Sequence, residues 1–128
     1  MRVDEMPAGR EMNALIAEKA MGWTVFYGEY KGYELFDDEV AQGYPPKEEA
    51  DGVPFEIPYY STDIAAAWEV VNRMKNYFFV CGRTDEGRWE AIFYPVNSGI
   101  GKLSEGRGDT VSLAICRAIL KAMGVNEV

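Results

Sequence analysis

The chain has 128 residues and a mass of 14.4 kDa, which is the size of one ordinary domain. Its composition is 48% hydrophobic and 27% charged, so the sequence predicts a folded chain rather than a disordered one. The net charge of −8 disfavours general binding to nucleic acid or to anionic membranes, because both need a basic surface.

The residue types exclude several classes of chemistry. The sequence contains no histidine, which rules out Ser-His-Asp and Cys-His catalysis and histidine-ligated zinc. Cys81 and Cys116 are too few for a zinc or disulfide framework. No apolar run approaches the roughly 20 residues that span a bilayer, and the first residues do not have the pattern of a signal peptide. We therefore expect a cytoplasmic protein that is not an enzyme and uses no cofactor or metal.

The first third of the chain predicts a helix and a hairpin. Residues 7–21 have apolar residues at helical spacing, with Pro7 suited to the first turn and Gly22 to the stop. Residues 23–27 are rich in β-branched and aromatic side chains, as strands are. The glycines of residues 28–32 favour a turn, so we expect residues 33–36 to return as the second strand of a hairpin.

Residues 37–60 predict a long acidic, proline-rich loop. The segment contains four prolines and seven acidic residues against one lysine, which disfavours a packed element. A loop of this length is often a binding loop or a mobile segment, and the alternative is a solvated insertion; we expect residues 37–60 to be the most mobile part of the free protein.

The middle of the chain predicts a helix followed by a hairpin. Ser61 or Thr62 can cap the helix, and its apolar face is expected in the core. That face comprises Ile64, Ala67, Trp68, Val71 and Met74. Residues 77–83 and 88–94 then read as two strands joined by a turn with Gly87 at positive φ. Because residues 77–83 are apolar on both faces, we expect them to form a central strand.

The last third predicts a glycine-rich connection and a closing helix. Residues 95–108 contain four glycines, and Asp109 or Thr110 can cap a helix that Gly124 stops after Met123. Only Ser112, Arg117 and Lys121 interrupt its apolar surface. We expect this helix to be deeply buried or to form a self-association face, so a homo-oligomer is one expectation.

The connection also contains a candidate ligand-binding site. Residues 97–102 lack the glycine and the Ser or Thr that a P-loop requires, since Val96 and Leu103 occupy those positions. Lys102 and Arg107 nevertheless flank glycines ahead of a helix N-terminus, in a segment (residues 91–128) that is not negatively charged. We therefore predict a phosphate-bearing small ligand at Asn97, Lys102 and Arg107, with Tyr59 or Tyr60 stacking on its base. The alternative is a flexible surface connection without a ligand.

Four stretches of the sequence resemble one family. Residues 13–23 (Asn-Ala-Leu-Ile-Ala-Glu-Lys-Ala-Met-Gly-Trp) are similar to the opening helix and Met-Gly-Trp stop of the phage ABA sandwich domain. Residues 58–71, 89–93 and 109–121 are similar to its second helix, a later strand and its closing helix. The resemblance implies an α+β fold and a phage or prophage origin, and it implies no particular activity.

These observations together predict one α+β domain over residues 1–128, a sandwich of a mostly antiparallel sheet of about four strands with three helices. The expected function is a phage-encoded, non-enzymatic binder that sequesters a small phosphate-bearing host metabolite, such as a nucleotide immune signal, in the host cytoplasm. The alternative is an acidic inhibitor that uses residues 37–60 to occupy the basic surface of a host protein. Neither function involves nucleic acid or a membrane as the partner.

Overall fold

The computed structural model describes residues 1–26, 29–30, 33–34, 41–46, 54–96 and 103–128. In chain order its elements are η1 (Val3–Glu5), α1 (Arg10–Lys19), β1 (Thr24–Phe26), β2 (Glu29–Tyr30), β3 (Tyr33–Glu34), β4 (Gln42–Tyr44), β5 (Phe55–Glu56), α2 (Ile64–Arg73), β6 (Tyr77–Arg83), β7 (Trp89–Pro95), β8 (Ser104–Gly108) and α3 (Val111–Ala122).

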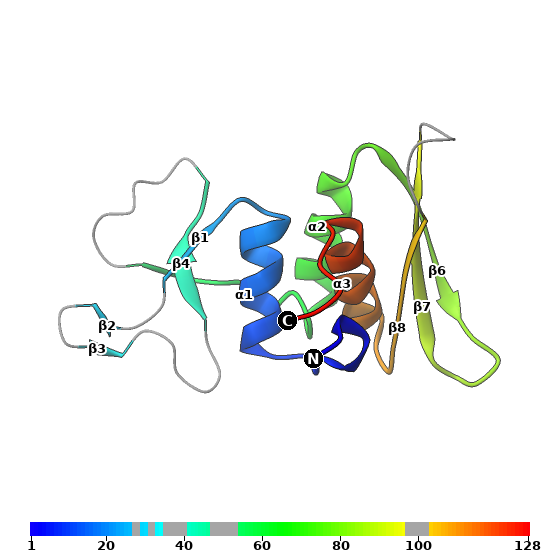
Figure 1. Ribbon diagram of the computed structural model, residues 1–128, viewed down its shortest axis with the longest axis horizontal. Coiled ribbons are helices and arrows are strands. Elements are labelled where there is room, and N and C mark those ends of the chain that lie inside the picture. The colour runs from blue at the N-terminus through cyan, green and yellow to red at the C-terminus, as the bar shows by residue number, and fades with distance from the viewer. Residues whose placement is uncertain (27–28, 31–32, 35–40, 47–53, 97–102) are drawn as a thin grey trace.

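The described strands form two three-stranded sheets, ordered β1-β4-β5 and β6-β7-β8, and a small hairpin of β2 and β3. Their pairings are all antiparallel. The helices lie between the two larger sheets, with α3 against β7 and β8 (Figure 1). The predicted α+β class with three α-helices is confirmed. The prediction of one sheet of about four strands is wrong, because β4 and β8 form in segments that the sequence predicts as loops and pair there with β1 and β7.

The first helix is shorter than predicted, and the strand that follows it, β1, does not pair with the predicted strand. It begins at Arg10 rather than near Pro7, and Gly22 follows its end with a φ of +74°. The predicted hairpin of residues 23–27 with 33–36 is wrong, since β1 pairs with β4 while β3 pairs with β2. The tertiary structure thus favours a distant partner over the nearest strand.

Parts of the acidic segment are packed. Residues 41–46 and 54–60 supply β4, β5 and the buried side chains of Ala41, Tyr44, Ile57 and Tyr60. The expectation that residues 37–60 contain no packed element is therefore wrong for these stretches. The predicted mobility of residues 37–60 falls in part on residues 37–40 and 47–53, which lie outside the described residues.

The second helix has a different cap from those predicted, and its predicted apolar face is buried at Ala67, Val71 and Met74 but exposed at Ile64 and Trp68. Asp63 is the N-cap, and its Oδ1 accepts from the Ala65 N–H at 3.0 Å. Ser61 is buried instead, where its hydroxyl donates to Asn13 Oδ1 at 2.7 Å. The helix buries Ala66, Ala67, Val70 and Val71, and Trp68 is 45% exposed. The prediction that Trp68 lies in the core is wrong, because the buried stripe is rotated toward the small side chains.

The sheet of β6, β7 and β8 differs from the predicted one in two ways. The hairpin of β6 and β7 is confirmed, with Gly87 at φ +78°. However, β6 is an edge strand, so its predicted central position is wrong. The third strand, β8, lies in the segment predicted as a glycine-rich connection. Its glycines permit close packing, because a Cβ on Gly106 would lie 2.4 Å from the backbone of Ala114 and Ala118.

The last helix is buried, which decides between the two alternatives for its apolar surface. Thr110 caps it by accepting from the Leu113 N–H at 3.2 Å, and Gly124 follows it at φ +86°. Eight of its residues are buried against the sheet and the other helices, including Ile115, Cys116 and Ile119. The apolar surface therefore belongs to the core rather than to a self-association face.

Candidate anion-binding site

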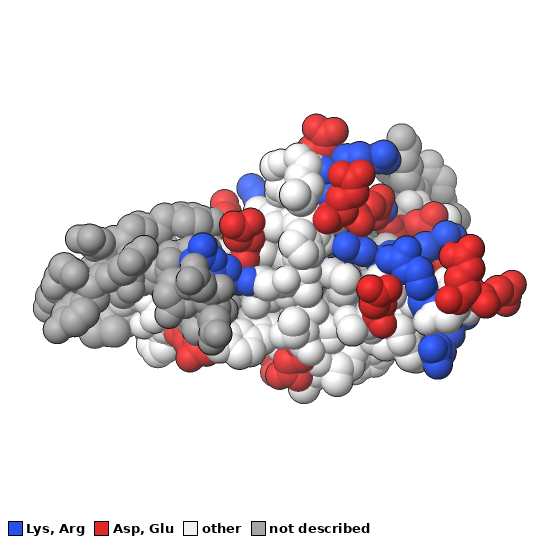
Figure 2. Space-filling model, turned by 90° about the horizontal axis from the view of Figure 1, so that it is seen from below, with Lys and Arg blue, Asp and Glu red and all other residues white. Residues whose placement is uncertain are grey.

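Four basic side chains surround one hollow at the β8 edge of the sheet. Arg88 precedes β7, Arg107 lies in β8, and Arg117 and Lys121 lie one turn apart on α3. The hollow has a volume of ≈ 300 Å³, and Asp4 and Glu105 complete its lining. Figure 2 shows Lys and Arg side chains gathered at the end of the molecule that the β6–β7–β8 sheet forms, interleaved with acidic side chains. This local excess of positive charge contrasts with the net charge of −8 for the chain.

Arg117 is the most buried of these cations. It is 7% exposed, its Nη1 donates to the Arg107 carbonyl at 2.7 Å, and its Nη2 donates to the Met6 carbonyl at 2.9 Å. Burial lowers the pKa of Arg117, and the charge of Arg88 lowers it further. A guanidinium group nevertheless stays protonated at neutral pH. Its Nε is buried and has no hydrogen-bond acceptor among the described residues.

The other three cations have partners that orient them. Lys121 Nζ donates to the Glu105 carbonyl at 2.9 Å and lies 2.5 Å from Asp4 Oδ1. Arg107 Nε donates to Glu90 Oε2 at 2.9 Å. Arg88 Nε forms an ion pair with Asp109, with 3.5 Å between Nε and Oδ1. This Nε atom is buried and has no hydrogen-bond acceptor in the described part of the chain.

A second hollow adjoins the first and shares two of its cations. It has a volume of ≈ 470 Å³ and lies against the sheet face that points away from the helices. Arg88 and Arg107 line both hollows. The second hollow also has apolar walls at Val80 and Ile92, beside the Glu90 carboxylate. A cationic hollow therefore opens next to a partly apolar one.

The chemistry of the first hollow fits an anion. Guanidinium and ammonium groups are the side chains that recognise carboxylates and phosphates, and arginine does so with two parallel donors. The carbonyl groups of Met6 and Arg107 fix Arg117 without neutralising its charge, whereas Lys121 is held by the Glu105 carbonyl and by its ion pair with Asp4. The positive charge is thus held in place before any ligand arrives.

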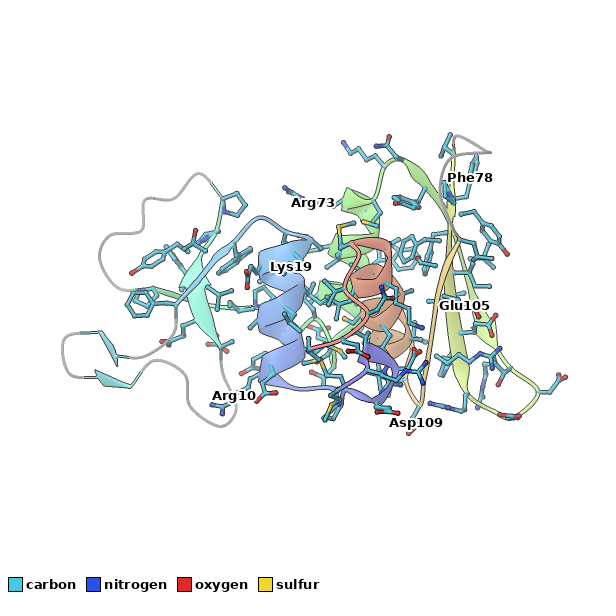
Figure 3. All side chains as sticks on the ribbon, viewed as in Figure 1. Arg10, Lys19, Arg73, Phe78, Glu105 and Asp109 are labelled. Carbon is cyan, nitrogen blue, oxygen red and sulfur yellow. The ribbon has the colours of Figure 1, made fainter. Side chains whose placement is uncertain are left out.

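The structure brings only one of the predicted site residues to this hollow. Arg107 lines it, whereas Asn97 and Lys102 lie outside the described residues. Tyr59 is exposed and lines a separate hollow with Glu56 and Asp63, which shares no residue with the basic one. Figure 3 shows Glu105 and Asp109 on the side of the molecule that the β6–β7–β8 sheet forms, and Arg73 at the C-terminal end of α2.

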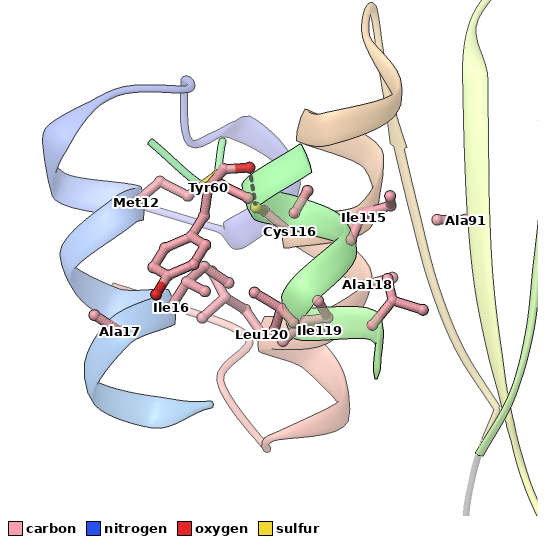
Figure 4. Close-up of a cluster of buried hydrophobic side chains, with 14 of the residues drawn as sticks. Met12, Ile16, Ala17, Tyr60, Ala91, Ile115, Cys116, Ala118, Ile119 and Leu120 are labelled. Atoms are coloured by element: carbon pink, nitrogen blue, oxygen red, sulfur yellow. Dashed lines mark hydrogen bonds between the residues drawn. The ribbon is translucent and has the colours of Figure 1, made fainter. Parts of the chain in front are cut away.

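Tyr60 belongs to the core. It is 1% exposed, and its carbonyl accepts from the Cys116 thiol at 3.2 Å (Figure 4). Burial raises the pKa of Tyr60 to about 12, with a smaller contribution from the charge of Glu69. Its ring packs beside α1 and α3, so it is not available to stack on a ligand in this structure.

Sequence reasoning missed Arg88, Arg117 and Lys121. A signal for two of them was present, because Arg117 and Lys121 interrupt an otherwise apolar helix at a spacing of four residues. Charged side chains on a buried helix need partners, and here the partners are carbonyl groups of β8 and of Met6. No comparable pattern marked Arg88, which follows the β6–β7 turn.

Within the described ranges, no group of acidic or cysteine side chains is arranged to hold a metal ion. No helix there is both long and apolar enough to cross a membrane.

Comparison with known proteins places the chain in a family. Residues 14–120 match the Phage ABA sandwich domain. A 2.0 Å crystal structure of a phage protein from Bacillus cereus ATCC 14579 has a similar fold, with a TM-score of 0.63 over 92% of this chain and 94% of that chain. The sequence identity is 22%, so this likeness concerns the fold alone. No curated protein matches the chain. Because the family match spans most of the sequence, this protein belongs to the phage ABA sandwich domain family.

Proposed function

We propose that the protein is a non-enzymatic phage protein that binds and sequesters a small phosphate-bearing molecule of the host. The proposal places the phosphate in the hollow of Arg88, Arg107, Arg117 and Lys121. A nucleotide that signals infection is the ligand class that fits a phage-encoded binder of this chemistry. The family membership supports the phage context, and the hollow supports the ligand chemistry.

The buried guanidinium group of Arg117 carries this proposal. Burying a charged group away from water is costly unless a counter-charge or hydrogen bonds compensate. Two carbonyl groups accept from Arg117, but its Nε and the Nε of Arg88 have no acceptor among the described residues. After a small rotation of the side chains, an anion in the hollow would supply both the counter-charge and the acceptors.

The neighbouring hollow supports a ligand larger than a phosphate ion. Ligand pockets generally have volumes of about 300–1,000 Å³ and combine apolar walls with a few polar groups. The two hollows share Arg88 and Arg107, and the second offers Val80 and Ile92 as apolar contacts. A nucleotide would place its phosphate among the cations and its sugar or base against the sheet face.

The side chains of the hollow favour binding over catalysis. Arginine and lysine are protonated at neutral pH and stabilise negative charge without exchanging protons. Sequestration needs only tight and selective binding, which these groups can supply together with the walls of the second hollow. The same site would therefore lower the free concentration of a signal without altering it.

Titration calorimetry against ATP, a cyclic dinucleotide and inorganic phosphate tests the proposal. Arg107 is the variant of choice, since its side chain is half-exposed and its loss leaves the core intact. A hydrogen bond to a charged group contributes roughly 1.5–3 kcal/mol, so Arg107→Ala should weaken binding about ten- to a hundredfold. Binding to the original protein should also weaken as salt is added.

Arg73→Ala is the matched control, because Arg73 is an exposed arginine at the C-terminal end of α2, away from the hollow (Figure 3). This variant should bind like the original protein. Equal weakening by Arg73→Ala would point to the overall charge rather than to the hollow. The absence of binding to any phosphate-bearing compound by the original protein would refute the proposal.

The alternative function, an acidic inhibitor that acts through residues 37–60, has less support. Its acidic residues fall mainly on residues 37–39 and 48–51, outside the described residues, while the described parts of the segment form β4 and β5. The placement of helices between two sheets supports the expected sandwich architecture for either function.

A further inference from the structure

The edge strand β6 presents an uncommon combination of features. It lies at one edge of its sheet, yet six of its seven residues are uncharged and five of these are large apolar residues or cysteine. Phe78 is 63% exposed and Val80 is 53% exposed on the sheet face that points away from the helices. Natural proteins generally protect such edges with charges, prolines or covering segments, because an open apolar edge pairs with other chains.

The hydrogen-bond ladder identifies which backbone groups point outward from β6. The Thr84 N–H donates to the Arg88 carbonyl at 2.7 Å, and the Val96 N–H donates to the Asn76 carbonyl at 2.9 Å. Because bonded and non-bonded pairs alternate in an antiparallel ladder, the even-numbered residues of β6 direct their backbone groups toward β7. The odd-numbered residues therefore direct theirs to the outer edge. Among the described residues, none bonds to the outward groups of Phe79, Cys81 or Arg83.

The opposite edge of the same sheet is closed. By the same alternation, Glu105 and Arg107 of β8 direct their backbone groups outward. Lys121 donates to the Glu105 carbonyl and Arg117 donates to the Arg107 carbonyl. These two side chains of α3 occupy the acceptors that a further strand would need. Among the described residues, β6 is therefore the edge of this sheet whose outward carbonyl groups remain available to a further strand.

We infer that β6 pairs with the β6 strand of a second copy of this chain, antiparallel about a two-fold axis at Val80. In this register Phe79 lies opposite Cys81 of the second copy, and these outward-facing residues form the hydrogen-bonded pairs. The two sheets then join into one continuous sheet of six strands, with the helices of both copies on the same side. Symmetric pairing of one patch with itself is the commonest way in which chains form homodimers.

The side chains of β6 are complementary in this register. Phe78 lies opposite Gly82 of the second copy, where a Cβ would meet no atom within 4 Å, so the phenylalanine ring has open space to cover. Tyr77 lies opposite Arg83, which places a cation beside an aromatic ring rather than beside a like charge. Val80 lies opposite its own counterpart, as a β-branched pair on the axis. No like charges of β6 face one another.

The helix beside β6 extends this apolar surface. Trp68 of α2 contacts Phe79 edge to face, with ring centroids 5.6 Å apart, and both Trp68 and Ile64 are exposed. In the paired arrangement, the two copies of α2 lie on the same side of the joined sheet. Their exposed apolar side chains would then contribute to the same interface, which accounts for large apolar groups that a monomer leaves in water.

Sedimentation equilibrium over a range of protein concentrations tests the inference, with Val80→Lys as the first variant. Val80 is exposed, so a lysine there leaves the monomer folded, but it places two like charges opposite each other on the axis. The original protein should be a dimer, and the dissociation constant of Val80→Lys should rise at least about a hundredfold. Leu103→Lys is the matched control, since Leu103 is 48% exposed and lies outside β6.

Cross-linking through an introduced cysteine tests the register. Cα atoms of a non-hydrogen-bonded pair lie about 4.5 Å apart, within the range of a disulfide. In a Cys81→Ser background, Val80→Cys should therefore form a covalent dimer under mild oxidation, and Gly82→Cys should not, because its two copies are separated by four residues along the strands. A monomeric original protein at about millimolar concentration, weakening by Leu103→Lys alone, or cross-linking of Gly82→Cys in preference to Val80→Cys would overturn the inference.

Discussion

The two edges of the β6–β7–β8 sheet differ in whether their outward backbone carbonyl groups have hydrogen-bond donors. At β8, α3 packs across the strand at Gly106, and Arg117 and Lys121 bond to its outward carbonyl groups. At β6, the outward backbone groups have no such partners among the described residues, and Phe78 and Val80 are exposed on the face that points away from the helices. The charged side chains of α3 thus have two places at one edge: they cap the outward carbonyl groups of β8 and they line the hollow for which we propose anion binding. The β6 edge is the one for which we propose a second copy of the chain.

The two cysteines provide the strongest contrast between the two sides of the sheet. Cys81 is exposed in β6, whereas Cys116 is buried in α3 against Tyr60, and burial raises the pKa of its thiol. In dilute protein, Ellman's reagent should modify Cys81 at least about a thousandfold faster than Cys116, because access to Cys116 requires opening of the core. Cys81→Ser should abolish the fast phase alone. Similar rates for both thiols would contradict the described packing of α3.

The glycines of the two edge strands should tolerate substitution unequally. A Cβ on Gly106 would lie 2.4 Å from backbone atoms of α3, which cannot move aside without displacing the helix. Gly106→Ala should therefore lower the free energy of unfolding by about 3 kcal/mol or more. Gly82→Ala in β6 meets open space, and its monomer should be as stable as the original protein. Urea unfolding of dilute protein measures both, and equal losses would refute the contrast.

Removal of the Arg117 charge tests how much the cap of the β8 edge contributes to stability. Arg117→Met keeps most of the side-chain volume but leaves the carbonyl groups of Met6 and Arg107 without their donors. The free energy of unfolding should fall by about 2–3 kcal/mol, since hydrogen bonds to charged groups are lost at a largely buried position. Thermal and urea unfolding would show this. An unchanged or increased stability would mean that the buried charge costs more than its bonds contribute, which would strengthen the functional interpretation.

The core behind α3 should lose stability in alkaline solution. Burial raises the pKa of Tyr60 to about 12, whereas the unfolded chain releases this proton near 10.0. The stabilisation is complete below pH 10 and is lost as the pH rises toward 12, because the unfolded state then binds fewer protons than the folded state. The expected loss is about 2 kcal/mol across that range. Tyr60→Phe should show a shallower decline, with the remainder due to Cys116 and to exposed groups; an identical decline would refute the assignment.

Trp68 should contribute less to stability than a core tryptophan, because it lies on α2 beside the open β6 edge and is half-exposed there. Its ring is 45% exposed and touches Phe79 edge to face. Trp68→Ala should lower the monomer's free energy of unfolding by about 1–2 kcal/mol rather than the larger cost of a core tryptophan. A loss above about 3 kcal/mol would show that Trp68 is more deeply packed than the structure describes.

Several features of this protein follow from local sequence and could be predicted without a structure. Thr110 as a cap, Gly87 as a turn residue and Gly22 and Gly124 as helix stops are local, because each depends on the conformation of one or two residues. The β6–β7 hairpin is local for the same reason. The residues of α3 predicted its burial or self-association, and the structure decides for burial.

Other features depended on which segments come together in space. The sequence of β6 is apolar on both faces. A central strand and an unpaired edge strand can both have this pattern, so only the order of strands in the sheet distinguishes them. The pairing of β1 with β4 and the position of β8 are long-range contacts that no local pattern specifies. Arg88, Arg107, Arg117 and Lys121 come from three different segments, and their hollow exists only because α3 crosses β8 closely at Gly106. Sequence alone indicated the family and the α+β class, and it predicted the Thr110 cap and the Gly87 turn because a cap and a turn depend on local conformation. Tertiary packing decided the buried stripe of α2, the strand pairing, the site and the open edge.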